Sequence, residues 1–168
     1  MLVYTSMENI HYNEVLIHAA RKGEVAVIQE LLEKNVDLNC KDEKGYTPLI
    51  IACYNNQAEA VKFLLDNGAD INGADNGGNT ALMGVCFKGY TDIARLLIKN
   101  GADLNQVYGN GGTALMFAAM FGRNDIIRLL LEAGADKTLA DVRGQNVYDI
   151  ARQQGNHAAV NILDEVYL

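Results

Sequence analysis

Six residues of this 168-residue chain could support covalent or metal chemistry. A cysteine beside a histidine base is a typical nucleophile pair, and mixed cysteine and histidine ligands are typical of zinc sites. No cluster of them has zinc-ligand spacing, and Ser6 is the single serine and lies in no nucleophile-elbow motif. The sequence therefore predicts no catalytic residue, no metal and no cofactor. The six residues are Cys40, Cys53, Cys86, His11, His18 and His157.

One segment formally matches a nucleotide-binding motif. Residues 109–114 read Gly-Asn-Gly-Gly-Thr-Ala, which fits the G-x-G-x-x-A pattern. That motif works after a strand of a parallel sheet, which this sequence does not predict. Gly111 and Thr113 instead keep the register of Gly78 and Thr80 in an internal repeat, so the repeat explains the match.

The same residue types recur at a step of 33 residues along the chain. A strict period of this length indicates a solenoid of stacked units, each of which buries its apolar face against its neighbours. We divide the chain into an N-terminal extension, residues 1–12, and a single repeat domain, residues 13–168. The expected repeats span about residues 13–41, 42–74, 75–107, 108–140 and 141–168. Leucines that keep the step are Leu31, Leu64, Leu97, Leu130 and Leu163.

The second repeat predicts two short helices followed by a turn-rich connection. Thr47 is a suitable helix N-cap, and Pro48 fits the first helical position. Asn55 and Asn56 tolerate the left-handed geometry that ends a first helix, and Gly68 ends a second one. Neither helix exceeds about ten residues, which is too short for stability in isolation.

Two motifs in this register resemble those of a known family. Gly45-Tyr-Thr-Pro-Leu and its counterparts in the next two repeats resemble the opening of an ankyrin repeat, and the segment from Leu64 to Asn72 resembles the end of its second helix. The resemblance covers about residues 13–168. It implies an all-α ankyrin-repeat solenoid of paired antiparallel helices with projecting hairpin-like loops. It also implies a concave face, lined by hairpin tips and first-helix ends, that binds a protein.

The chain departs from the ankyrin pattern at the histidine that follows the leucine. Ile50, Met83, Met116 and Asp149 replace it, so apolar packing must take the place of its hydrogen bonds. With methionine at this position, the chain resembles small bacterial ankyrin proteins.

The outermost repeats carry polar residues at positions that are small or apolar in the other repeats. These are Glu30 in the first repeat, and Arg152 and Asp164 in the last. Terminal repeats need a polar outer face because nothing covers them. We therefore expect a complete five-repeat protein.

Acidic residues recur with the turns, and asparagines follow them by two residues. Loop hydrogen bonding is their expected role, although the resemblance also implies that such an asparagine is a hydroxylation target where the enzyme exists. The residues are Asp37, Asp70, Asp103 and Asp136, with Asn39, Asn72 and Asn105.

Charge and composition restrict the partners. The net charge is −7, from 21 acidic and 14 basic residues. Duplex binding depends on Lys and Arg that neutralise phosphates, so neither nucleic acid nor an anionic membrane is expected as a partner. No apolar run approaches the roughly 20 residues that span a bilayer. The odd number of cysteines and the lack of a signal-like start predict a cytoplasmic protein, or an exported one if a signal peptide was removed.

Nine residues are expected to bind the partner on the concave face. Aromatic residues and methionine are enriched in interface cores, and an exposed apolar stripe is uncommon on a monomer without a partner. The alternative is that Phe87 and Phe121 fold back into the groove as internal packing. The nine residues are Tyr46, Tyr54, Asn55, Phe87, Lys88, Tyr108, Met120, Phe121 and Gln154.

These observations predict a non-catalytic protein-interaction module. It binds a partner protein or peptide on the concave face by apolar contact, in an acidic background. The alternative to a monomer is a self-associating structural protein with the same face in a homodimer interface. An enzymatic interpretation rests on Cys53 or Cys86 alone.

Overall fold

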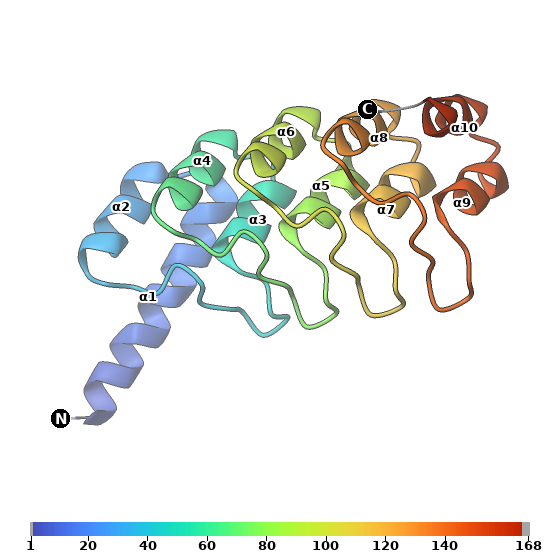
Figure 1. Ribbon diagram of the computed structural model, residues 1–168. Helices are drawn as coiled ribbons and strands as arrows, with labels where there is room; N and C mark the ends of the chain where they lie inside the picture. Colours follow the sequence, from blue (N-terminus) through green and yellow to red (C-terminus); the bar gives the residue numbers. More distant parts are fainter. Residues whose placement is uncertain (1, 166–168) are drawn as a thin grey trace.

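The chain folds into a row of five helix pairs (Figure 1). The computed structural model describes the backbone of residues 2–165 and the side chains of residues 11–165. Within that part the prediction of an all-α solenoid is confirmed, and the extended structure is limited to isolated bridges. The helices are α1 (Leu2–Lys22), α2 (Val25–Glu33), α3 (Pro48–Tyr54), α4 (Ala58–Asp66), α5 (Ala81–Lys88), α6 (Thr91–Lys99), α7 (Ala114–Met120), α8 (Asn124–Glu132), α9 (Val147–Gln153) and α10 (His157–Asp164).

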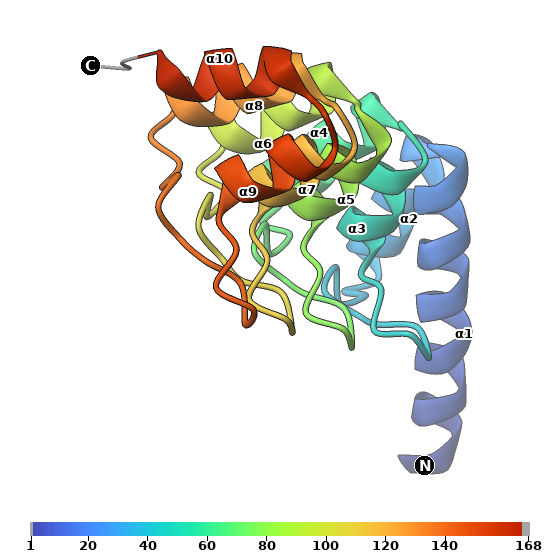
Figure 2. The ribbon, with the colours of Figure 1, turned by 90° about the vertical axis from the view of Figure 1, so that its right-hand side faces the viewer.

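The helices form two stacked layers. We call α1, α3, α5, α7 and α9 the inner helices, and the others the outer helices. Each inner helix contacts the next inner helix, and each outer helix contacts the next outer helix. Loops project from the helical layers on the side of the inner helices (Figures 1 and 2). The apolar core therefore runs continuously along the row.

Small side chains allow the inner helices to stack closely. Ala20, Cys53, Cys86 and Ala119 occupy equivalent positions, and all four are fully buried. Larger side chains there would force the repeats apart. The residues in place of the family's histidine are also buried in the second, third and fourth repeats, so the expected apolar packing is confirmed.

Threonine hydroxyls start the three central inner helices. Thr47, Thr80 and Thr113 are buried, and each side chain accepts a hydrogen bond from the backbone N–H three residues later. The predicted N-cap and the proline at the start of α3 are confirmed. Only one of the two asparagines after α3 is left-handed: Asn56 has φ 58°, whereas Asn55 has φ −99°.

An asparagine ladder links the connections of successive repeats. Each asparagine Oδ1 accepts a hydrogen bond from the backbone N–H of the aspartate one repeat later, at 2.8–2.9 Å. The aspartates close their own turns by accepting the N–H two residues on. The expected loop hydrogen bonding is confirmed. The ladder pairs are Asn39 with Asp70, Asn72 with Asp103, and Asn105 with Asp136.

The hairpin loops are closed by a second set of aspartates. Asp42, Asp75 and Asp141 each accept the backbone N–H groups two and four residues later. The fourth repeat has Tyr108 at this position, and the Asn110 side chain accepts the backbone N–H of Gly112 instead. Neighbouring hairpins also bond to each other through backbone groups.

The first helix is longer than the repeat requires. It spans 21 residues and crosses the expected boundary between the extension and the repeat domain, which remains a prediction. The expected outer boundaries at residues 1 and 168 lie outside the described residues. Glu30, Arg152 and Asp164, expected as polar cap residues, are all exposed. Among the described residues, no helix is long and apolar enough to cross a membrane.

We predict that Asn72→Ala lowers the free energy of unfolding by about 1 kcal/mol, because it leaves the N–H of Asp103 without its ladder acceptor. Urea unfolding followed by circular dichroism measures the change. Asn100→Ala is the control, because its side-chain amide bonds only within its own helix end. Equal stability loss in the two variants would contradict a role of the ladder in joining repeats.

Candidate partner-binding face

Aromatic rings form a continuous row along the inner helices. Tyr54 stacks on Phe87, with ring centres 6.2 Å apart. Phe87 meets Phe121 edge-on at 4.6 Å, and Phe121 stacks near Phe117 at 6.5 Å. Tyr108 then meets Phe117 edge-on at 5.9 Å. These five residues, which we call the aromatic row, join the second, third and fourth repeats.

The aromatic row is packed internally but keeps an exposed surface. Phe87 is half-buried between its two neighbours, whereas 44% of Tyr54 and 37% of Phe121 remain exposed. The adjacent Met120 is 39% exposed. Large apolar side chains therefore face solvent at the ends of both α3 and α7.

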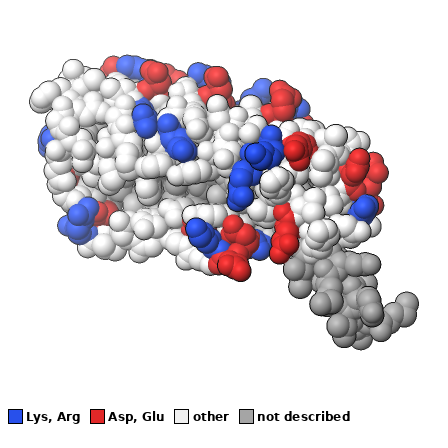
Figure 3. Space-filling view, turned by 180° about the vertical axis from the view of Figure 1, so that it is seen from behind, with Lys and Arg blue, Asp and Glu red and all other residues white. Residues whose placement is uncertain are grey.

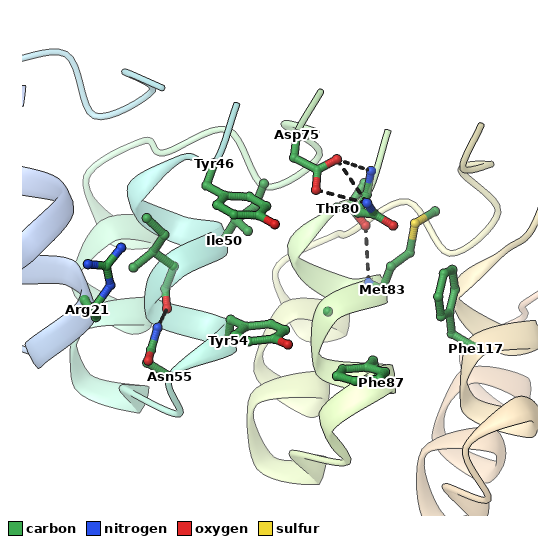
Figure 4. A pocket seen from close by; sticks show the side chains of 13 residues that line it. Arg21, Tyr46, Ile50, Tyr54, Asn55, Asp75, Thr80, Met83, Phe87 and Phe117 are labelled. Atoms are coloured by element: carbon green, nitrogen blue, oxygen red, sulfur yellow. Dashed lines mark hydrogen bonds between the residues drawn. The ribbon is translucent and has the colours of Figure 1, made fainter. Parts of the chain in front are cut away.

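A hollow with a volume of about 470 Å³ lies between α3 and α5, beside the aromatic row. Tyr46, Tyr54, Phe87 and Phe117 lie around it, and Arg21 stands at its edge (Figure 4). The rest of the lining includes aliphatic side chains, the Met83 thioether and the Asn79 amide. The remaining lining residues are Ile50, Ile51, Asn55, Asp75, Asn79, Thr80, Met83 and Gly84.

Gly84 leaves space at this hollow. Its equivalents one repeat away on either side are Ile51 and Phe117, and the fifth repeat has Ile150. A Cβ atom added to Gly84 would meet only Tyr54, at 3.7 Å, which is an ordinary contact. Crowding therefore does not require a glycine here. The absence of a side chain opens the hollow, whereas the repeats on either side have a large side chain at this position.

The charges on this face differ from those of the whole chain. The three central inner helices, α3, α5 and α7, contain no acidic residue. Lys88 places its ammonium 4.4 Å from the ring centre of Tyr54, and Arg123 donates two hydrogen bonds to the carbonyl of Phe87. Lys and Arg side chains cross the middle of the face in Figure 3, whereas most Asp and Glu side chains gather along its margins. The acidic residues of this face lie in its hairpins, Asp42, Glu43 and Asp75 among them, and the ends of the inner helices carry cations, so the expected acidic background stays a prediction.

The structure brings most of the nine expected residues into one region. Tyr46, Tyr54, Asn55 and Phe87 line the hollow. Contacts with the rings of Tyr54 and Phe87 add Lys88 and Phe121, and Tyr108 joins through the ring of Phe117. Met120 and Gln154 are exposed at the equivalent ends of α7 and α9, outside the hollow's lining.

Sequence reasoning missed three residues of the site. Phe117 and Gly84 share a register position with the buried Ile51 and Ile150, so the period alone does not single them out. The signal was their difference in size, since one position holds an aromatic ring in one repeat and no side chain in the next. Arg21 precedes the first connection and gave no signal beyond its charge.

The three thiols are buried within the stack. Burial, and to a smaller degree Asp37, raises the pKa of Cys40 from 9.0 to about 11. Burial also raises the pKa of Cys53 and of Cys86. Among the described residues, no group of three or more His, Cys, Asp or Glu side chains could hold a metal ion.

A family comparison agrees with the helical stack. The family model for ankyrin repeats matches residues 16–108, 73–141 and 102–165 in three copies. The chain therefore belongs to the ankyrin-repeat family, whose members generally act in protein–protein interaction and are typically non-catalytic. The comparison with curated proteins found no match.

Gly84, inside α5, and Gly89, the C-cap that follows it, should respond oppositely to substitution by alanine. We predict that Gly84→Ala raises the free energy of unfolding by about 1 kcal/mol, because it removes a glycine from a helix interior. Gly89→Ala should lower it by about 1–2 kcal/mol, since φ is 85° there and the new Cβ would lie 2.9 Å from Arg123 Nε. Chemical denaturation of both variants measures the difference. A loss of stability in Gly84→Ala would show that this glycine is needed for packing.

The thiols should be unreactive in the folded protein. At pH 8 we expect little reaction with a disulfide reagent, because the raised pKa values keep the thiols protonated, and reaction of all three on unfolding. The contribution of Cys40 to stability is present below the ordinary pKa of 9.0 and is lost as pH rises through about 11. Those of Cys53 and Cys86 are lost at still higher pH, because burial raises their pKa further. Rapid labelling of native Cys53 or Cys86 would contradict this account and reopen a catalytic role.

Proposed function

We propose that this chain is a non-catalytic module that binds a partner protein or peptide through the aromatic row and the adjacent hollow. Both lie on the concave face formed by the inner helices and the hairpin loops, which we call the inner face. The observation that carries the proposal is the row itself. Its rings contact one another across three repeats, yet Tyr54 and Phe121 still present apolar surface to solvent.

The row has the properties of an interface core. Aromatic rings, methionine and arginine are enriched in such cores, and tyrosine is frequent among residues that dominate binding energy. Mutual packing restrains the rings before a partner arrives, so binding costs little side-chain entropy. The position also follows the repeat architecture, because each inner helix ends on the same face of the stack.

The non-catalytic part of the proposal is supported by the candidate nucleophiles. Cys53 and Cys86 are fully buried in the contacts between inner helices. Burial disfavours the thiolate that a nucleophilic cysteine needs. Their position equivalent to Ala20 and Ala119 gives them a packing role.

We predict that Tyr54→Ser combined with Phe121→Ser weakens peptide binding at least tenfold, because it removes both exposed rings of the row. Peptides selected from a random display library on the wild-type protein, and titrated by fluorescence anisotropy, provide the measurement. The melting temperature should fall by several degrees but the protein should stay folded, since the change also removes ring contacts within the row and about 1 kcal/mol shifts the melting temperature by about 2–4 °C in a chain of this size.

Arg95→Ala on the exposed side of α6 is the matched control and should bind as the wild type does. Unfolding of the double variant would assign the rings to internal packing. Light scattering of the free protein tests the homodimer alternative, and a dimer broken by the same double variant would favour it.

A further inference from the structure

We infer that the hollow between α3 and α5 receives one bulky apolar side chain from an acidic segment of a partner protein. This inference rests on the proposed function and adds the chemistry of the partner to it. Three observations carry it: the space at Gly84, the rings around that space, and the sign of the charges beside it.

The lining of the hollow selects an apolar group. Its volume of about 470 Å³ lies in the range of sites that bury small organic groups, about 300–1,000 Å³. An inserted side chain would contact carbon atoms on several sides (Figure 4). These belong to the rings of Tyr46, Tyr54, Phe87 and Phe117 and to the side chains around Gly84. The neighbouring repeats fill the equivalent position with isoleucine or phenylalanine. In the third repeat Gly84 leaves this space empty, so a side chain of that kind from a partner could occupy it.

Positive charge flanks the hollow. Arg21 lines its edge from the last turn of α1 and is exposed. Lys88 lies over the Tyr54 ring, and the Arg123 guanidinium is held at the Phe87 carbonyl. Acidic side chains approach two of these cations from other elements, since Glu14, Asp42 and Glu43 line a groove with Arg21, and Asp125 lines another with Arg123. Helices α3, α5 and α7 themselves carry no acidic residue, so Lys88 has no carboxylate beside it on the central inner helices.

One carboxylate does line the hollow, that of Asp75. It accepts hydrogen bonds from the backbone N–H groups of Gly77 and Asn79 and two from the Asn79 side-chain amide. The carboxylate oxygens of Asp75 are thus used in hydrogen bonds that close the hairpin. Asp75 lies on the loop side of the hollow, not at the helix ends. Carboxylates of a bound segment would therefore lie toward Arg21 and Lys88, at the opposite edge.

The same charges disfavour other occupants. A symmetric pair of chains that joined these faces would bring the same patch of both copies together, so Arg21, Lys88 and Arg123 would face their own equivalents. Nucleic acid binding draws its affinity from many phosphate contacts, whereas the chain has a net charge of −7 and only a few cations here. An acidic protein segment with an apolar anchor satisfies both the rings and the charges.

The test is a selection of random displayed peptides on three proteins: the wild type, Gly84→Ile, and the double variant Arg21→Glu with Lys88→Glu. Gly84→Ile introduces the residue that the second and fifth repeats already have at this position. Arg95→Glu with Lys99→Glu is the matched control, because it makes the same change in net charge on exposed positions of the outer helix α6. Circular dichroism and melting temperature establish that each variant is folded, and Gly84→Ala replaces Gly84→Ile if the latter is not.

We expect peptides enriched on the wild type to share a bulky apolar residue and to contain more Asp and Glu than the starting library. Gly84→Ile should weaken a selected peptide at least tenfold, and Gly84→Ala by less. The charge-reversed inner-face variant should weaken it about tenfold, since two exposed charge pairs are each replaced by repulsion. The control should keep wild-type affinity, and raising the salt from about 0.05 M to 0.5 M should weaken binding to the wild type.

Each contrary outcome identifies what fails. Equal binding of a selected peptide to wild type and Gly84→Ile overturns the role of the hollow, and selected peptides that are basic or neutral overturn the acidic partner. Either result leaves the proposed function intact as long as the Tyr54→Ser, Phe121→Ser variant loses binding. Selection of no peptide, or binding of a single-stranded RNA probe in its place, overturns both.

Discussion

The structure depends on the burial of each helix pair against the next. Helices α2 to α10 have seven to nine residues, too few for stability alone in water. The stack brings them together because the inner-helix contact is made by small, fully buried residues such as Cys53 and Ala119. Backbone groups at the edge of each contact then bond across it, as Asp103 does to Asn72. Packing and hydrogen bonding thus support the same spacing between repeats.

This arrangement divides each inner helix between two tasks. The side that faces the neighbouring repeats keeps the same residue types along the row, because a change in volume there would disturb the stack. The exposed end is free to differ, and it does, from Tyr54 to Phe87 to Met120. Gly84 lies between these two regions, and its lack of a side chain costs helix stability without relieving any close contact. A cost of that kind is typical of functional positions.

The repeat period was sufficient to predict the fold but only part of the candidate site. Helix caps such as Thr47 and the burial of Cys53 follow from local rules applied at each step of the period. Ring contacts do not, because they depend on the sizes of side chains in adjacent repeats. Phe117 joins the aromatic row through Phe121 and through Tyr108, which stands where most other repeats have a hairpin aspartate. The helix formed by the N-terminal extension has no counterpart in the period and could not be predicted from it.

The distribution of charge follows from the same division. Aspartates close the turns of nearly every repeat, where backbone N–H groups need acceptors, and the outer helices carry most of the remaining acids. Such residues account for a net charge that is negative overall. The central inner helices contain none, because neither their buried sides nor their ends require a carboxylate. Lys88 and Arg123 then place cations at the ends of the inner helices, and Arg21 places one at the edge of the hollow, whereas Asp42, Glu43 and Asp75 lie in the hairpins. Net charge therefore describes the scaffold of this protein, whereas the sign at the aromatic row is decided by residues that the scaffold does not need.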